Sequence, residues 1–139
     1  MTHFIIATHE RLSEGFKHTL EYIAPNSIKL STIAAYVHNI PVEEELVNLL
    51  EEIGKDEQVL ILTDLLGGSV NQECAKFLHR ENVHVITGLN FPLLLSLAIE
   101  AAEGEVSAEK IRQHILEARE QIIYVNDYLA RPVLDFDDE

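Results

Sequence analysis

Two polar side chains that could take part in chemistry follow two of the most apolar segments of the chain. His9 comes directly after residues 3–7 and Thr8, and Asp64 comes directly after residues 59–63. Both apolar segments are typical of buried strands. Open α/β sheets keep their functional groups in the crevice beyond the carboxyl ends of parallel strands. If the two strands are neighbours in such a sheet, His9 and Asp64 meet in that crevice.

A histidine held by an aspartate is suited to the transfer of a phosphoryl group. The unperturbed imidazole pKa lies near neutrality, so a neutral nitrogen is available as a nucleophile. A carboxylate that accepts the hydrogen of Nδ1 would fix the tautomer, leave the Nε2 lone pair free and offset positive charge on the ring. His9 is therefore the candidate nucleophile, and Asp64 is the candidate that orients it.

A glycine-rich turn after Asp64 could hold the phosphoryl group. Gly67 and Gly68 permit a tight turn whose N–H groups point into the site, and Ser69 adds a hydroxyl. The N-terminus of the following helix would add partial positive charge. Nothing in this chemistry requires a metal, because transfer between two nitrogens depends mainly on positioning and electrostatic support. Taken singly, His9 could be a surface residue and Asp64 a helix cap; their combination with the turn is more specific.

Composition restricts the class of protein. The chain has 139 residues, and we expect one domain over residues 1–139. Its 24 acidic residues outnumber its 10 Lys and Arg residues, for a net charge of −14. This charge argues against binding to nucleic acid or an anionic membrane surface, and favours a basic protein partner. Cys74 is the only cysteine, which excludes an intrachain disulfide. Because no membrane span or signal peptide is evident, we expect a cytoplasmic protein.

Apolar runs alternate with helical patterns along the chain, which is typical of a parallel sheet covered on both faces. Strands are predicted at residues 3–7, 28–34, 59–63, 83–87 and 122–125. Helices are predicted at residues 12–24, 41–53, from 69 onward, 92–102 and 108–119. The buried face of the first helix is expected to carry Leu12, Phe16, Leu20 and Ile23, and that of the third helix to include Leu78. Residues 135–139 are predicted to be a solvated acidic tail.

Three segments carry a resemblance to a known family. They are Thr8-His9, Asp64-Leu65-Leu66-Gly67-Gly68-Ser69 and Gly88-Leu89-Asn90-Phe91-Pro92-Leu93-Leu94. In this order and spacing they resemble the signatures of the enzyme IIA domain of the mannose-family sugar phosphotransferase system, over nearly the whole chain. The resemblance implies a doubly wound α/β fold whose four-stranded parallel sheet has the order 2-1-3-4. It also implies a fifth, antiparallel strand at residues 122–129, exchanged between the subunits of a homodimer.

The resemblance further implies an activity and a set of partners. HPr, which is phosphorylated by enzyme I at the expense of phosphoenolpyruvate, would pass its phosphoryl group to His9. The group would then pass to a histidine of the IIB component, and from IIB to a sugar entering through the membrane components IIC and IID. Asp64 would orient His9, and Ser69 with the backbone of Gly67 and Gly68 would contact the phosphoryl oxygens. No cofactor or metal is implied.

Three positions depart from the usual pattern of this family. Glu10 stands where glycine usually follows the histidine, so a carboxylate could repel the phosphoryl group. Ser69 is followed by Val-Asn-Gln instead of Pro-Phe-Asn, so Asn71 or Gln72 takes the place of the usual polar side chain. Leu66 replaces an aromatic residue often found before the glycine pair, which could alter the surface that docks a partner.

Three alternative functions are weighed against this one. A phosphocarrier domain of a phosphoenolpyruvate-dependent dihydroxyacetone kinase would have a similar fold and histidine, although the segment after Asp64 is closer to the sugar-transport branch. A IIA-like regulatory domain without onward transfer is a second alternative, which Glu10 makes conceivable. A receiver-like domain phosphorylated on Asp64 is the third. It would need paired acids for a metal after the first strand and a lysine beyond a later strand, and the sequence offers neither.

Overall fold

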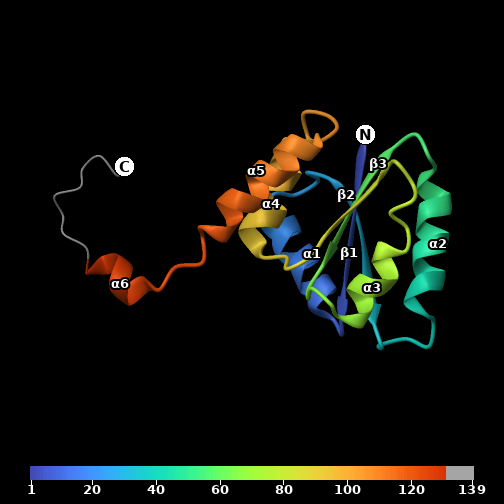
Figure 1. Cartoon of the computed structure of the whole chain (residues 1–139), viewed down its shortest axis with the longest axis horizontal. Helices are drawn as coiled ribbons and strands as arrows, with labels where there is room; N and C mark the ends of the chain where they lie inside the picture. The colour runs from blue at the N-terminus through green and yellow to red at the C-terminus, as the bar shows by residue number, and fades with distance from the viewer. Residues whose placement is uncertain (131–139) are drawn as a thin grey trace.

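The computed structural model describes residues 1–130 and is built around a four-stranded parallel sheet (Figure 1). The strands are β1 (Thr2–His9), β2 (Lys29–Ala35), β3 (Gln58–Thr63) and β4 (Val83–Ile86). Their order across the sheet is β2-β1-β3-β4, which confirms the predicted topology. The helices are α1 (Leu12–Ile23), α2 (Val42–Ile53), α3 (Ser69–Ala75), α4 (Phe91–Ala101), α5 (Ala108–Arg119) and α6 (Val125–Leu129).

The sheet separates two hydrophobic cores, because consecutive side chains of a strand point to opposite faces. In β1, Phe4 and Ile6 pack with residues of α1, α4 and α5. Ile5 and Ala7 pack on the other face with residues of α2 and α3. Figure 1 shows the corresponding layers, with α1, α4 and α5 on one side of the sheet and α2 and α3 on the other. Helices on both faces make this a doubly wound α/β fold.

Helix boundaries follow local signals in the sequence. The Ser107 hydroxyl accepts a hydrogen bond from the Lys110 N–H at 3.2 Å and caps α5. The Asn90 side chain caps α4 by accepting from the Leu93 N–H at 2.9 Å. Helix α2 is followed by Gly54, whose positive φ of 87° favours glycine. Within residues 1–130 no helix combines the length and apolar character needed to cross a lipid bilayer.

The predicted buried face of α1 is confirmed at Leu20 and Phe16 and wrong at Leu12 and Ile23. Leu12 and Ile23 are exposed, whereas Ser13 and Leu20 are buried. The Ser13 N–H bonds to the Thr8 hydroxyl at 2.7 Å, which places Ser13, and not Leu12, against the sheet. Leu78, predicted on the buried face of the third helix, lies beyond the end of α3 and is also exposed.

The predicted fifth strand is not formed within the described chain. Residues 122–124 form no regular structure, and residues 125–129 form the short helix α6. Every residue from 119 to 130 is exposed, and Figure 1 shows this segment projecting away from the sheet. Apolar β-branched residues favour a strand only where a neighbouring strand pairs with them, and nothing within residues 1–130 does so. The predicted acidic tail, residues 135–139, lies outside the described residues.

Candidate functional site

The site lies at the carboxyl ends of the two central strands. His9 is the last residue of β1, and Asp64 directly follows β3. These strands are paired, with Ala7 in register with Thr63, so the residues that follow leave the sheet side by side. From β1 the chain turns through α1 to β2, whereas β3 lies on the opposite side of β1. This reversal of strand order is the place where open α/β sheets bind ligands.

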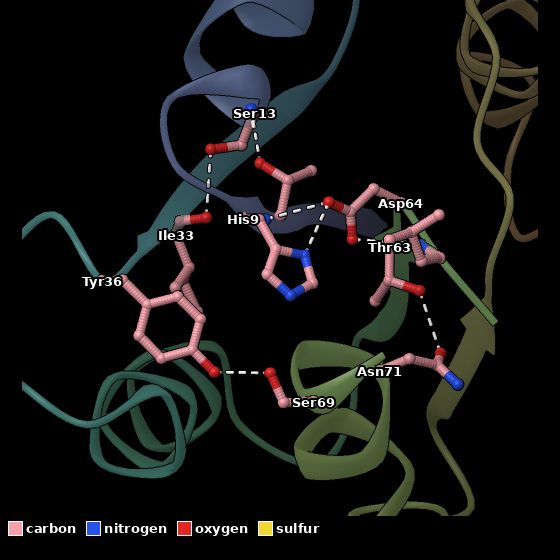
Figure 2. Close-up of polar contacts among 10 residues, drawn as sticks. His9, Ser13, Ile33, Tyr36, Thr63, Asp64, Ser69 and Asn71 are labelled. Atoms are coloured by element: carbon pink, nitrogen blue, oxygen red, sulfur yellow. Dashed lines mark hydrogen bonds and ion pairs between the residues drawn. The ribbon is translucent and has the colours of Figure 1, made fainter. Parts of the chain in front are cut away.

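The structure brings His9 and Asp64 into direct contact (Figure 2). Asp64 Oδ2 lies 3.0 Å from His9 Nδ1 and also accepts the His9 backbone N–H at 3.0 Å. The other carboxylate oxygen, Oδ1, accepts the Leu65 N–H at 3.0 Å. Three contacts therefore fix the carboxylate, and one of them fixes the imidazole ring.

This contact determines which ring nitrogen is free. An ionised carboxylate only accepts hydrogen bonds, so Nδ1 carries the proton and Nε2 of the neutral ring carries a lone pair. Burial acts to raise the pKa of Asp64, but hydrogen bonds from the His9 backbone and ring outweigh it and hold that pKa below its usual value. The Asp64 side chain is 11% exposed and that of His9 is 35% exposed. No residue in the described part of the chain bonds to Nε2, which is left as an accessible nucleophile.

The glycine turn packs closely against the His9 ring. Gly67 has a φ of 79°, which favours glycine, and a Cβ added there would meet open space. A Cβ added to Gly68 would lie 3.2 Å from His9 Cε1 and 3.3 Å from the Leu65 carbonyl oxygen. The Gly68 N–H donates to that same Leu65 carbonyl at 3.2 Å and is used within the turn. Gly68 therefore contributes room for the ring, and not the free N–H expected from the sequence.

Ser69, the first residue of α3, is linked to a residue that the sequence did not single out. The Tyr36 hydroxyl and the Ser69 hydroxyl are hydrogen-bonded to each other. Tyr36 directly follows β2, and its ring centroid lies 5.8 Å from that of His9, with the planes tilted by 36°. In Figure 2 the His9 ring lies between Asp64 on one side and Tyr36 with Ser69 on the other. An aromatic residue at the carboxyl end of a strand adjoining β1 is the one sequence signal that could have indicated it.

Polar side chains also anchor the turn that follows His9. The Thr8 hydroxyl accepts the Ser13 N–H at 2.7 Å, and the Ser13 hydroxyl donates to the Ile33 carbonyl at 3.0 Å. These contacts, drawn in Figure 2, connect β1, the start of α1 and β2 next to the site. All three residues are buried, so the turn carrying His9 is built on a fixed base.

The structure shows the surroundings of the residues that depart from the resembled pattern. Glu10 adopts a left-handed φ of 53°, the conformation for which glycine is best suited, while its N–H bonds to the Ala35 carbonyl at 3.0 Å. The Asn71 side chain accepts a hydrogen bond from the Thr63 hydroxyl at 2.9 Å, which links α3 to β3. The Gln72 side chain donates a hydrogen bond to the Gly67 carbonyl at 3.1 Å. Leu66 is 82% exposed.

Cys74 does not offer a second nucleophile. Burial raises the pKa of the Cys74 thiol to about 12, so it remains protonated and is a poor nucleophile. Within residues 1–130, no group of three or more His, Cys, Asp and Glu side chains is placed to hold a metal ion. The arrangement is suited to a histidine nucleophile with a carboxylate partner.

Comparison with known proteins identifies a matching family. A family model described as "PTS system fructose IIA component" matches residues 3–116. No curated protein matches the chain.

Several solved structures are similar to this one. A protein from Klebsiella pneumoniae, described as a candidate phosphoenolpyruvate-dependent sugar phosphotransferase system permease, has 31% identity and a TM-score of 0.85, over 93% of this chain and 94% of that one. A IIA protein from Streptococcus pneumoniae, associated with a fucose utilization operon, has 25% identity and a TM-score of 0.76, over 92% and 96% of the two chains. Component EIIA from Streptococcus agalactiae has 23% identity and a TM-score of 0.76, over 91% and 99%, and shares the fold.

Proposed function

Because the chain belongs to the family of PTS fructose IIA components, we propose that it is the phosphoryl-transfer subunit of a phosphoenolpyruvate-dependent sugar phosphotransferase system (PTS). HPr donates the phosphoryl group to His9, and the IIB component receives it from His9. The sugar is taken up through the membrane components IIC and IID, which this chain serves indirectly through IIB. We propose a cytoplasmic location on the same basis. The hydrogen bond between His9 Nδ1 and Asp64 Oδ2 is the observation that carries this proposal.

In the proposed transfer, the lone pair of His9 Nε2 attacks the phosphorus atom carried by the donor. A new N–P bond forms on His9, while the bond between phosphorus and the donor nitrogen breaks and its electron pair stays with that nitrogen. The proton on Nδ1 remains in place, so positive charge builds up on the His9 ring. The Asp64 carboxylate, 3.0 Å away, offsets this charge. The same steps in reverse pass the group to a histidine of IIB.

Ser69 and the turn at Gly67 and Gly68 form the proposed phosphoryl-binding side of the site. Gly68 allows the turn to approach the ring closely, because any side chain there would crowd His9 Cε1. Ser69 supplies a hydroxyl on the side of the ring away from Asp64 (Figure 2). In this role the hydroxyl donates to a phosphoryl oxygen, and the charge-assisted bond stabilises both the transition state and the phosphorylated form.

An exposed apolar surface around His9 supports docking of protein partners. Leu12, Tyr36, Leu65 and Leu66 are all exposed and lie on the segments that follow β1, β2 and β3. Exposed apolar patches on a protein surface commonly mark interaction sites. The net charge of −14 would steer a basic partner toward this protein. Both features suit a protein that must bind a donor and an acceptor in turn through the same surface.

We also propose a homodimer in which residues 121–130 pack against a second copy of the chain. This segment exposes a series of large apolar side chains, namely Ile122, Ile123, Tyr124, Val125, Tyr128 and Leu129. Strand β4 is an edge of the sheet, and an apolar groove beside it is lined by Ile86, Ile111 and Ile115. Such an edge is a ready partner for an added strand. Sedimentation analysis of the full chain should give twice the monomer mass, and Ile122→Asp should shift it toward the monomer.

Phosphorylation with phosphoenolpyruvate, enzyme I and HPr tests the proposed carrier. We expect acid-labile, alkali-stable phosphate on the wild-type protein and none on His9→Ala. His18→Ala is a matched control, because His18 is an exposed imidazole on α1 outside the site, and it should be labelled like the wild type. Equal labelling of His9→Ala would overturn the assignment.

The acceptor is tested by offering the labelled protein to partner proteins. Transfer of the label to a IIB component supports the proposed function. Transfer only to dihydroxyacetone kinase subunits would assign the chain to that kinase. A label that stays on His9 in the presence of every acceptor would indicate a regulatory protein without onward transfer.

A further inference from the structure

Tyr36 combines a costly backbone conformation with two contacts to the site. Its φ is 68°, in the left-handed region that bulky residues seldom adopt. Its side chain is not held by burial, since the residue is 66% exposed. Instead its hydroxyl bonds to Ser69, 33 residues later in the chain, and its ring lies beside that of His9. Such conformations persist where the surroundings hold them, and they are frequent at functional sites.

The neighbouring strand β1 is also followed by a residue in the left-handed conformation. His9 and Ala35 are register partners at the ends of β1 and β2, and each is followed by a left-handed residue, Glu10 and Tyr36 respectively. The Glu10 N–H bonds to the Ala35 carbonyl at 3.0 Å and ties the two turns together. The conformation of Tyr36 therefore belongs to the same pair of turns that carries the His9 side chain.

We propose that Tyr36 is a positioning residue for phosphoryl transfer, whose hydroxyl donates to Ser69 and thereby aims the Ser69 O–H at the phosphoryl group on His9. This inference rests on the proposed function and deepens it, because it adds a residue that acts on the phosphoryl group through another. Tyr36 forms and breaks no covalent bond.

Counting hydrogens supports this direction of donation. Each of the two hydroxyls has a single hydrogen. If Ser69 donates to Tyr36, Ser69 has none left for a phosphoryl oxygen. If Tyr36 donates to Ser69, the Ser69 hydrogen is free, and accepting one bond strengthens Ser69 as a donor in the next. An anionic phosphoryl group next to His9 favours the second arrangement.

The experiment measures phosphorylation of His9 by phosphoramidate, a small donor that needs no protein docking. Tyr36→Phe keeps the ring and removes only the hydroxyl. We expect it to lower the rate about fivefold to tenfold, as for the loss of one hydrogen bond in the transition state. Tyr22→Phe is the matched control, because Tyr22 is an exposed tyrosine on α1, and its rate should equal that of the wild type. Thermal unfolding of each variant verifies that the fold is intact.

A double-mutant cycle with Ser69→Ala tests whether Tyr36 acts through Ser69. We expect the double variant to be no slower than Ser69→Ala alone, because the Tyr36 hydroxyl then has nothing to aim. Fully multiplicative losses would overturn the proposal. A Tyr36→Phe defect that is seen with phosphorylated HPr but absent with phosphoramidate would also overturn it, since Tyr36 would then be a docking residue.

If wild-type His9 is phosphorylated and Tyr36→Phe reacts within twofold of it, this inference fails while the proposed function stands. If wild-type His9 accepts no phosphate from either donor, the proposed function itself fails.

Discussion

Replacing Asp64 by asparagine should slow phosphorylation of His9 roughly tenfold to hundredfold. The carboxylate makes three contacts, with His9 Nδ1, the His9 N–H and the Leu65 N–H. An asparagine has one acceptor oxygen in place of two. If that oxygen faces His9, the amide NH₂ opposes the Leu65 N–H. Because Leu65 is an exposed residue, we expect its N–H to bond to water instead. The correct tautomer is then kept, and only the negative charge is lost.

The size of the effect follows from that lost charge. A hydrogen bond to a charged group contributes about 1.5–3 kcal/mol, and each 1.36 kcal/mol changes a rate about tenfold. The Asp64 side chain is only 11% exposed, so solvent screens it little. If the amide turns the other way and donates to Nδ1, the proton moves to Nε2 and the rate falls further.

Rapid-quench measurement of single-turnover transfer from phosphorylated HPr would give this rate. Asp56→Asn is a matched control, because Asp56 is an exposed aspartate in the loop before β3, at the end of the sheet opposite the site. Its rate should equal that of the wild type. A rate for Asp64→Asn within twofold of the wild type would refute the argument that this carboxylate supports the charged ring.

Three further predictions concern stability and the turns around the site. Glu10→Gly should raise the free energy of unfolding by up to about 1 kcal/mol in urea denaturation, because Glu10 has a φ of 53°; a lower stability would contradict the claimed strain. The same change should speed transfer, because it removes a carboxylate that repels the phosphoryl group. Gly67→Ala should cost about 1 kcal/mol of stability with little change in rate, whereas Gly68→Ala should mainly slow transfer by displacing the His9 ring. The reverse pattern would show that the turn does not position the ring. The pKa of Asp64 is lowered on folding, so its contribution to stability is present above the unfolded pKa of about 3.9 and is lost as pH falls through the folded value. The stability difference between the wild type and Asp64→Asn should therefore shrink below about pH 4, and a difference that grows there would contradict the shift.

The sheet and most helices could be predicted because their signals are local. Strand β3 is a continuous apolar run that suits a central strand buried on both faces. Helix α5 begins and ends where Ser107 and the apolar spacing indicated, and Pro92 lies in the first turn of α4. The sheet order came from the family resemblance, and with it the expectation that His9 and Asp64 lie together, as they do in the structure.

The errors arose where nonlocal contacts decide the outcome. The apolar run at residues 122–125 predicted a strand, but strand formation depends on a partner, and none within the described chain pairs with it. Leu12 has the spacing of a buried residue, yet the Thr8–Ser13 hydrogen bond rotates α1 so that Leu12 faces solvent. Tyr36 was missed because its contact with Ser69 spans 33 residues and depends on a left-handed turn. A tyrosine gives no local sign of such a turn.

The state of the two His9 ring nitrogens tests the central claim most directly. Nitrogen-15 and phosphorus-31 NMR of the phosphorylated protein, with its histidines labelled, would identify the atom that carries phosphate and the atom that carries the proton. We predict a phosphorus–nitrogen coupling at Nε2 of His9 and a slowly exchanging proton on Nδ1, protected by the bond to Asp64. Phosphate on Nδ1, on Asp64 or on any other residue would contradict the account.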